Sequence, residues 1–101
     1  MRGVKVEGIQ WDEGNWPKCG KHGVSKLEVE LLFRNDPAII RDDAHSQTES
    51  RFKAIGQTAE GRDVFVIFTL RCSDQLWYIR PISARYMHAE EVRSYEKQRE
   101  A

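Results

Sequence analysis

The segment from Val64 to Leu70 reads Val-Phe-Val-Ile-Phe-Thr-Leu and limits the possible folds more than any other part of the sequence. A strand with one wet face alternates apolar and polar residues, whereas this segment is apolar apart from Thr69, so both of its faces should be buried. It is short for a buried helix, it is rich in β-branched and aromatic residues, and turn-forming residues bound it on both sides. The pattern therefore predicts the central strand of a small sheet.

Length and composition narrow the class of protein. The chain has 101 residues, of which 40% are hydrophobic and 32% are charged, and this predicts one domain over residues 1–101. Its 16 basic residues balance its 16 acidic residues, so the net charge indicates neither a nucleic-acid partner nor a membrane partner. The sequence shows no apolar run of membrane length and no signal-peptide core. Cys19 and Cys72 are far apart and are expected to be reduced thiols in a cytoplasmic protein.

Patterns in the first part of the chain predict one strand and two helices. Val4–Trp11 alternates and is expected to form a strand with one wet face. A short helix is predicted from Lys18 to about His22, with Gly23 as its natural end. Ser25–Glu28 has the form of a capping box and begins a second helix, which Asn35-Asp36-Pro37 should end.

The rest of the chain predicts more strands and a final helix. The strands expected around the central one are Ala38–Arg41, Ser50–Ile55 and Leu76–Ala84. Pro81 cannot donate a backbone hydrogen bond, so its nitrogen should face an edge or a bulge. A charged helix is expected from about Met87 to Arg99. Short connections favour antiparallel pairing, so the predicted fold class is α+β, a small antiparallel sheet with two N-terminal helices and one C-terminal helix.

The residues offer no metal-binding motif, phosphate-binding loop or nucleophile elbow, so we predict neither a metal nor a cofactor. The remaining candidates are basic residues near strand ends: Arg62, Arg71, Arg80 and Arg85. In an antiparallel hairpin the start of one strand lies beside the end of the next, so Arg62 should approach Arg85. Two converging guanidinium groups can clamp a phosphate. From spacing alone, however, the favoured interpretation is that these arginines are solvated or paired with nearby carboxylates.

His22 and Glu49 are the candidate acid–base groups, and Tyr95 is a third polar candidate in the last helix. His22 ends the predicted short helix, where the helix dipole favours its charged form. Each also has a structural interpretation: His22 can bond a helix carbonyl, Glu49 can be solvated or paired with Arg51, and Tyr95 can be a packing residue. From the residues alone, the structural interpretation is the favoured one for each of the three.

Several short motifs, taken together, resemble the BrnT family of toxins. They are Trp11-Asp12, Lys21–Ser25, Phe33, Asn35–Pro37, Asp43, His45-Ser46, Glu49, Arg51-Phe52, Ile55-Gly56, Gly61-Arg62, Phe68-Thr69, Ile82–Arg85 and Tyr95-Glu96. The resemblance covers nearly the whole chain, and its most specific parts are His-Gly-Val-Ser and Ile-Ser-Ala-Arg at this separation. The chain departs from the family in its balanced charge, since the family is usually more basic. It also has Pro81 where the family more often has an apolar residue.

The resemblance implies a type II toxin–antitoxin toxin with a RelE/ParE-like fold. Such a protein would be a metal-independent endoribonuclease that cleaves RNA in the cytoplasm and inhibits translation. Its partner would be a BrnA-like ribbon-helix-helix antitoxin. The toxin would contact DNA only indirectly, through its complex with this antitoxin.

The resemblance also assigns roles to residues. Arg62, Arg80 and Arg85 would stabilise the charge that builds on the phosphate when a ribose 2′-hydroxyl attacks it. His22, Glu49 or Tyr95 would carry protons. The residues expected to bind RNA are Arg51, Lys53, Arg80 and Lys21.

A hypothesis from a different class is a non-catalytic interaction domain with the same fold. It would either block a cellular target or act as an inactive toxin within an antitoxin repressor complex. The neutral charge and Pro81 favour this alternative slightly, whereas the basic residues and proton carriers at family positions favour the ribonuclease.

Overall fold

The computed structural model describes residues 5–42 and 49–100, with the backbone alone for residues 98–100. Its elements are β1 (Val6–Ile9), the 3₁₀ turn η1 (Lys18–Gly20), α1 (Lys26–Arg34), β2 (Ala38–Arg41), β3 (Phe52–Gln57), β4 (Asp63–Ser73), β5 (Leu76–Tyr86) and α2 (Ala89–Glu100). The predicted α+β class is confirmed. The motif residues Asp43, His45 and Ser46 lie outside the described residues.

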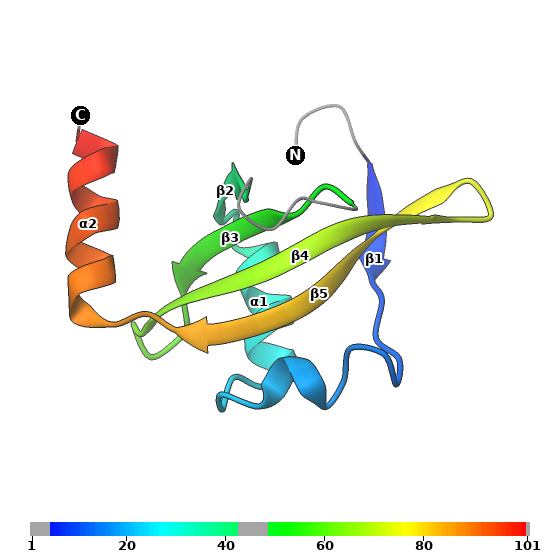
Figure 1. Ribbon diagram of the computed structural model, residues 1–101, viewed down its shortest axis with the longest axis horizontal. Helices are drawn as coiled ribbons and strands as arrows, with labels where there is room; N and C mark the ends of the chain where they lie inside the picture. Colours follow the sequence, from blue (N-terminus) through cyan, green and yellow to red (C-terminus); the bar gives the residue numbers. More distant parts are fainter. Residues whose placement is uncertain (1–4, 43–48, 101) are drawn as a thin grey trace.

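The strands form one sheet in the order β1-β5-β4-β3-β2, so β4 is the central strand, as predicted (Figure 1). Pairs from β2 to β5 are antiparallel, but β1 runs parallel to β5, with Val6 beside Trp77. The prediction of a wholly antiparallel sheet is therefore wrong for β1. A parallel neighbour needs a long connection rather than a hairpin, and the whole chain between β1 and β5 provides it.

Strand β4 is buried on both faces between Val64 and Thr69, where every residue except Ile67 is buried. Val64, Val66 and Phe68 face α1, and the Phe68 ring meets Phe33 of that helix edge-on at 5.0 Å between centroids. Thr69, on the other face, is only 3% exposed, and its hydroxyl donates to the Ser50 carbonyl at 2.8 Å. The one polar residue of the buried run is thus satisfied, as burial requires.

Helix α1 has the predicted capping box. The Glu28 amide donates to Ser25 Oγ at 3.1 Å, and the Ser25 amide donates to Glu28 Oε1 at 2.9 Å. These bonds satisfy two amides that have no partner within the helix. The helix ends at Arg34, with Asn35 as its C-cap, where the sequence places the stop signal.

The predicted helix from Lys18 to His22 is wrong, because the structure has only the short 3₁₀ turn η1 there. Gly20 explains the difference: a Cβ at this position would lie 2.5 Å from an atom of the Trp16 ring. Only glycine lets the Trp16 ring pack this close to the backbone, and glycine also lowers the stability of a helix. Over the described residues the fold therefore has two α-helices, one fewer than expected.

Pro81 lies at an irregularity of the β4–β5 ladder, as expected. Phe68 pairs with Pro81 and Ile67 pairs with Ser83, so Ile82 is the extra residue of a bulge. The Pro81 carbonyl accepts a hydrogen bond at 2.9 Å from the buried side chain of Asn15. This bond holds the loop after β1 against β5.

Helix α2 stands at one end of the sheet and projects beyond it (Figure 1). Glu91, Val92 and Tyr95 are its partly buried residues between Ala89 and Lys97, and the others there are exposed. Neither α1 nor α2 is long and apolar enough to span a lipid bilayer, and these are the α-helices of the described chain.

Replacing Ser25 by Ala should lower the free energy of unfolding by about 1 kcal/mol, because it removes the side-chain acceptor of the capping box. Urea denaturation of the purified protein measures this change. Ser94→Ala, at an exposed position inside α2, is the control and should leave stability nearly unchanged. Equal stability of Ser25→Ala and the wild type would show that the cap contributes nothing.

Candidate functional site

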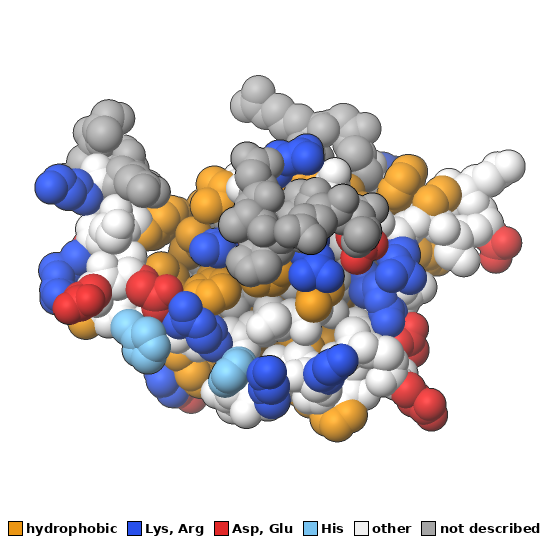
Figure 2. Space-filling view, in the orientation of Figure 1, with side chains coloured by type: hydrophobic (Ala, Val, Ile, Leu, Met, Phe, Trp, Pro, Cys, Tyr) orange, Lys and Arg blue, Asp and Glu red, His pale blue; other side chains and the backbone are white. Residues whose placement is uncertain are grey.

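The face of the sheet opposite α1 is the candidate site, and we call it the open face. Side chains alternate along a strand, so Ile67 faces away from α1 while Val66 and Phe68 face toward it. Lys53 of β3 and Ser83 of β5 are the cross-strand neighbours of Ile67 and share this face. Figure 1 views the molecule from this side, with α1 behind β4, and Figure 2 shows Lys and Arg side chains spread over the same face.

Two neighbouring hollows on the open face, each of about 360 Å³, have part of their lining in common, and together we call them the basic trough. They share the lining residues Arg51, Ile82 and Ser83. The charged residues of the first hollow are Lys18, Lys21, Glu49, Arg51, Arg71 and Arg80. Those of the second are Asp42, Arg51, Lys53 and Arg85. Cations outnumber carboxylates in both, so the trough attracts anions although the chain as a whole is neutral.

Glu49 is the carboxylate within the first hollow. Its Oε2 lies 4.0 Å from a guanidinium nitrogen of Arg71, and both side chains are substantially exposed, at 35% for Glu49 and 51% for Arg71. Exposed pairs of this kind are weak. Glu49 is therefore an ionisable group among cations, held by no strong ion pair with Arg71.

Arg80 is anchored by the loop after β1. Its two terminal nitrogens donate to the two oxygens of Asp12, each at 2.8 Å, and one of them also donates to Gln10 Oε1 at 3.0 Å. This hydrogen bonding to Arg80, followed by the bond from the Gly14 amide, lowers the pKa of Asp12 to about 2. A Cβ at Gly14 would lie 2.6 Å from Arg80, so glycine permits this close approach. Arg80 thus connects β5 to the loop while lining the trough.

Arg85 is anchored in a similar way by α2. Its terminal nitrogens donate to the two Glu91 oxygens at 2.7 and 2.8 Å. The hydrogen bond from Arg85, with a second from the His88 amide, lowers the pKa of Glu91 to about 2. The guanidinium carbon of Arg85 also lies 4.4 Å from the ring centroid of Phe65, and the Lys53 ammonium nitrogen lies 4.8 Å from it. Two cations thus cover one buried aromatic ring.

Arg62 and Arg85 do not meet, which corrects the expectation that they form one phosphate clamp. The Arg62 guanidinium lies 3.4 Å from the ring centroid of Tyr86, whose hydroxyl donates to Glu28 of α1. Tyr86 therefore faces the α1 side, while Arg85, the preceding residue of β5, faces the open side with Phe65. The hairpin brings the two arginines to the same end of the sheet but to opposite faces of it.

The other predicted site residues divide into two groups. All four expected RNA-binding residues line the basic trough: Lys21, Arg51, Lys53 and Arg80. Glu49 and Arg85 of the expected catalytic set line it as well. His22 is exposed beside Lys21 but is not part of the lining, and Tyr95 lines a different cleft beside Asp63 and Gln57. Placement does not establish the role of any of these residues, and their roles stay predictions.

Sequence reasoning omitted two cations of the trough from its site residues. Lys18 lies three residues before Lys21, a spacing that puts both on one side of a helical turn, and this signal could have been used. Arg71 was recognised among the basic residues near strand ends but was given no role. It enters the trough because β4 continues beyond the expected strand, through Arg71 to Ser73.

Comparison with known protein families identifies a match over most of the chain. A family model described as the ribonuclease toxin, BrnT, of type II toxin–antitoxin systems matches residues 11–91, which is most of the chain. The matched region runs from the loop after β1 to the start of α2 and so contains the charged residues of the basic trough. A search of curated proteins gives no significant match.

The two anchoring ion pairs should make stability depend on pH in the acid range. The pKa values of Asp12 and Glu91 fall from 3.8 and 4.5 to about 2, so the stabilisation is complete above pH 4.5 and is lost as the pH falls toward 2. We expect Asp12→Asn/Glu91→Gln to be less stable than the wild type at pH 6 and to lose stability less steeply between pH 4.5 and 2. Urea denaturation at each pH measures this, and parallel curves would contradict it.

Proposed function

The chain belongs to the BrnT family of ribonuclease toxins of type II toxin–antitoxin systems, and from this membership we propose that the basic trough is where it binds and cleaves RNA. The proposed activity is that of a metal-independent endoribonuclease with a RelE-like fold. Cleavage of messenger RNA would then inhibit translation. The family membership supports ribonuclease activity, and the trough supports the location.

The observation that carries the location is the set of cations around Glu49. Lys18 lies in the turn η1, Lys21 is its C-cap residue, and Arg51 comes from the segment just before β3, yet they line one hollow with this carboxylate. Cations bind the RNA backbone through its phosphates, largely independently of base sequence. The second hollow shares Arg51 and Ser83 with the first, so the trough offers room for more than one nucleotide.

The proposed chemistry needs a base, an acid and cations near one phosphate. The ribose 2′-oxygen attacks the adjacent phosphorus, and its proton passes to Glu49. The bond from phosphorus to the 5′-oxygen breaks, which gives a 2′,3′-cyclic phosphate and a 5′-hydroxyl. His22, the residue that follows Lys21 in the chain, is the proposed acid that protonates this leaving oxygen. Arg51 and the neighbouring lysines stabilise the negative charge that develops on the phosphate.

A second candidate function is a non-catalytic interaction domain, and one feature of the trough favours it. Arg80 and Arg85 are each held by two hydrogen bonds to a carboxylate, so much of their charge is already balanced within the chain. A toxin that blocks a target protein, or an inactive toxin in a repressor complex, needs no free guanidinium at this face. Mapping of RNA ends after induction separates the two candidates, since only the ribonuclease produces new cuts.

Arg51→Ala should reduce the rate of RNA cleavage by about 10²–10³-fold, a typical cost of removing one donor that stabilises a developing charge. Arg62→Ala is the matched control, because Arg62 stacks on Tyr86 at the opposite face, and it should cleave at nearly the wild-type rate. Gel analysis of a labelled RNA with each purified variant measures both rates. Loss of cleavage in Arg62→Ala with full activity in Arg51→Ala would place the site on the other face.

Glu49→Gln should separate catalysis from binding. Cleavage should fall by about 10²–10⁴-fold because the base is removed, whereas RNA affinity should stay equal or rise because a negative charge leaves the trough. Single-turnover cleavage and fluorescence anisotropy measure the two quantities, and wild-type cleavage is repeated with EDTA. Full activity of Glu49→Gln would refute its role, and loss of wild-type activity in EDTA would refute metal independence.

A further inference from the structure

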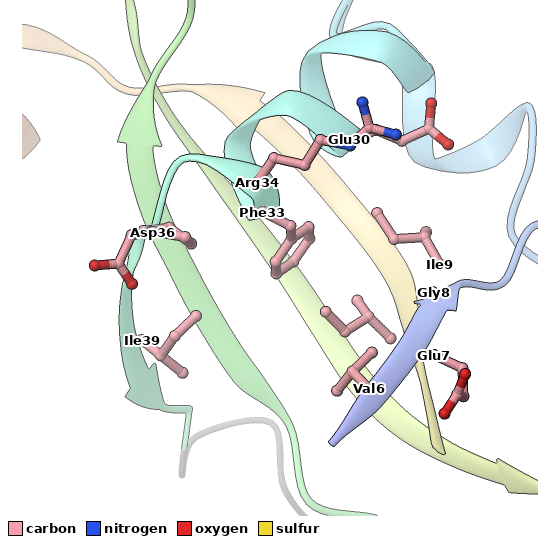
Figure 3. Close-up of a pocket in the computed structure, with 11 residues that line it drawn as sticks. Val6, Glu7, Gly8, Ile9, Glu30, Phe33, Arg34, Asp36 and Ile39 are labelled. Atoms are coloured by element: carbon pink, nitrogen blue, oxygen red, sulfur yellow. The ribbon is translucent and has the colours of Figure 1, made fainter. Parts of the chain in front are cut away.

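A second concavity lies on the α1 side of the sheet, away from the basic trough. Figure 3 shows this groove between β1, α1 and β2, and its volume is about 490 Å³. Its apolar lining residues are Val6, Ile9, Phe33, Pro37, Ile39 and Ile79. Helix α1 covers only part of this face of the sheet, and the groove is the part beside it.

The groove continues the hydrophobic core toward the surface. Val6, Ile9, Phe33 and Ile39 pack against the core but are only partly buried. Trp77 lies beside Val6 in the β1–β5 pair, on the same side of β5 as Ile79, and is 42% exposed. Exposed apolar surface with polar borders marks interaction sites, and tryptophan is enriched among the residues that dominate binding energy.

The border of the groove is acidic. Glu7, Glu30 and Asp36 carry negative charge there and Arg34 carries positive charge, so the lining has a net charge of −2 (three carboxylates and one guanidinium). This charge repels a nucleic acid, and an apolar floor does not suit a phosphate backbone. The chemistry instead fits a protein segment with apolar side chains and flanking Lys or Arg residues.

We propose that this groove binds the antitoxin, through a segment that inserts apolar side chains between β1 and α1 and places basic residues against Glu7 and Glu30. The inference rests on the toxin–antitoxin assignment of the proposed function, but it does not require that the chain cut RNA. Because β1 is an outer strand among the described strands of the sheet, a segment in the groove can also pair with the backbone of β1 on the side away from β5. The partner is anchored on the face opposite the RNA site.

The test reverses the charge of the border. Glu7→Lys/Glu30→Lys should weaken binding of the antitoxin encoded beside the toxin gene by at least about tenfold, and Trp77→Ala should weaken it similarly. Glu13→Lys/Glu60→Lys, which changes exposed carboxylates outside the groove by the same net charge, should bind within about twofold of the wild type. Isothermal titration calorimetry measures the dissociation constants, and circular dichroism confirms that each variant is folded.

Measuring RNA cleavage by the same variants tests the groove independently of the nuclease proposal. Groove variants that lose antitoxin binding but cut RNA at the wild-type rate are the expected result. If the chain cuts no RNA and the groove variants still lose binding, the groove is supported and the nuclease is refuted. Unchanged affinity of Glu7→Lys/Glu30→Lys, or affinity lost equally in the control variant, would overturn the inference.

Discussion

Burial of β4 on both of its faces is the constraint from which the rest of the structure follows. Helix α1 covers one face, where Phe33 packs on Phe68. On the other face, Phe65 is only 8% exposed. Lys53 and Arg85 lie over its ring, because long cationic side chains can shield apolar surface while their charges stay in water. The side chains that shield Phe65 of β4 from water are cationic, and they therefore add positive charge to the open face.

Charge of opposite sign predominates in the two concavities even though acidic and basic residues balance in number over the chain. The basic trough lies on the open face, and the groove with Glu7, Glu30 and Asp36 lies on the face of α1. Net charge averages over both faces, which is why equal numbers of acidic and basic residues do not reveal the basic trough.

The sequence predicted those features that depend on neighbouring residues. The central strand, the capping box at Ser25 and the irregularity at Pro81 each follow from local patterns, and the structure has all three. The parallel pairing of β1 depends on contacts far apart in the chain, which no local pattern encodes. The predicted contact between Arg62 and Arg85 does not form, and the reason is also structural. A hairpin fixes which strand ends are close, but the face of each side chain depends on single-residue register.

The anchored arginines connect the trough to the two ends of the chain. A phosphate that binds Arg85 in bidentate fashion must replace Glu91, which also accepts a hydrogen bond from the His88 amide just before α2. A phosphate at Arg80 must likewise replace Asp12, whose bonds hold the loop after β1. Each replacement exchanges one charge-assisted pair for another, so its net free energy is small compared with either pair alone. On the proposed RNA-binding function, such an exchange at Arg80 or Arg85 would therefore add little affinity by itself, and affinity would depend on the further cations that line the trough, such as Lys18 and Lys21.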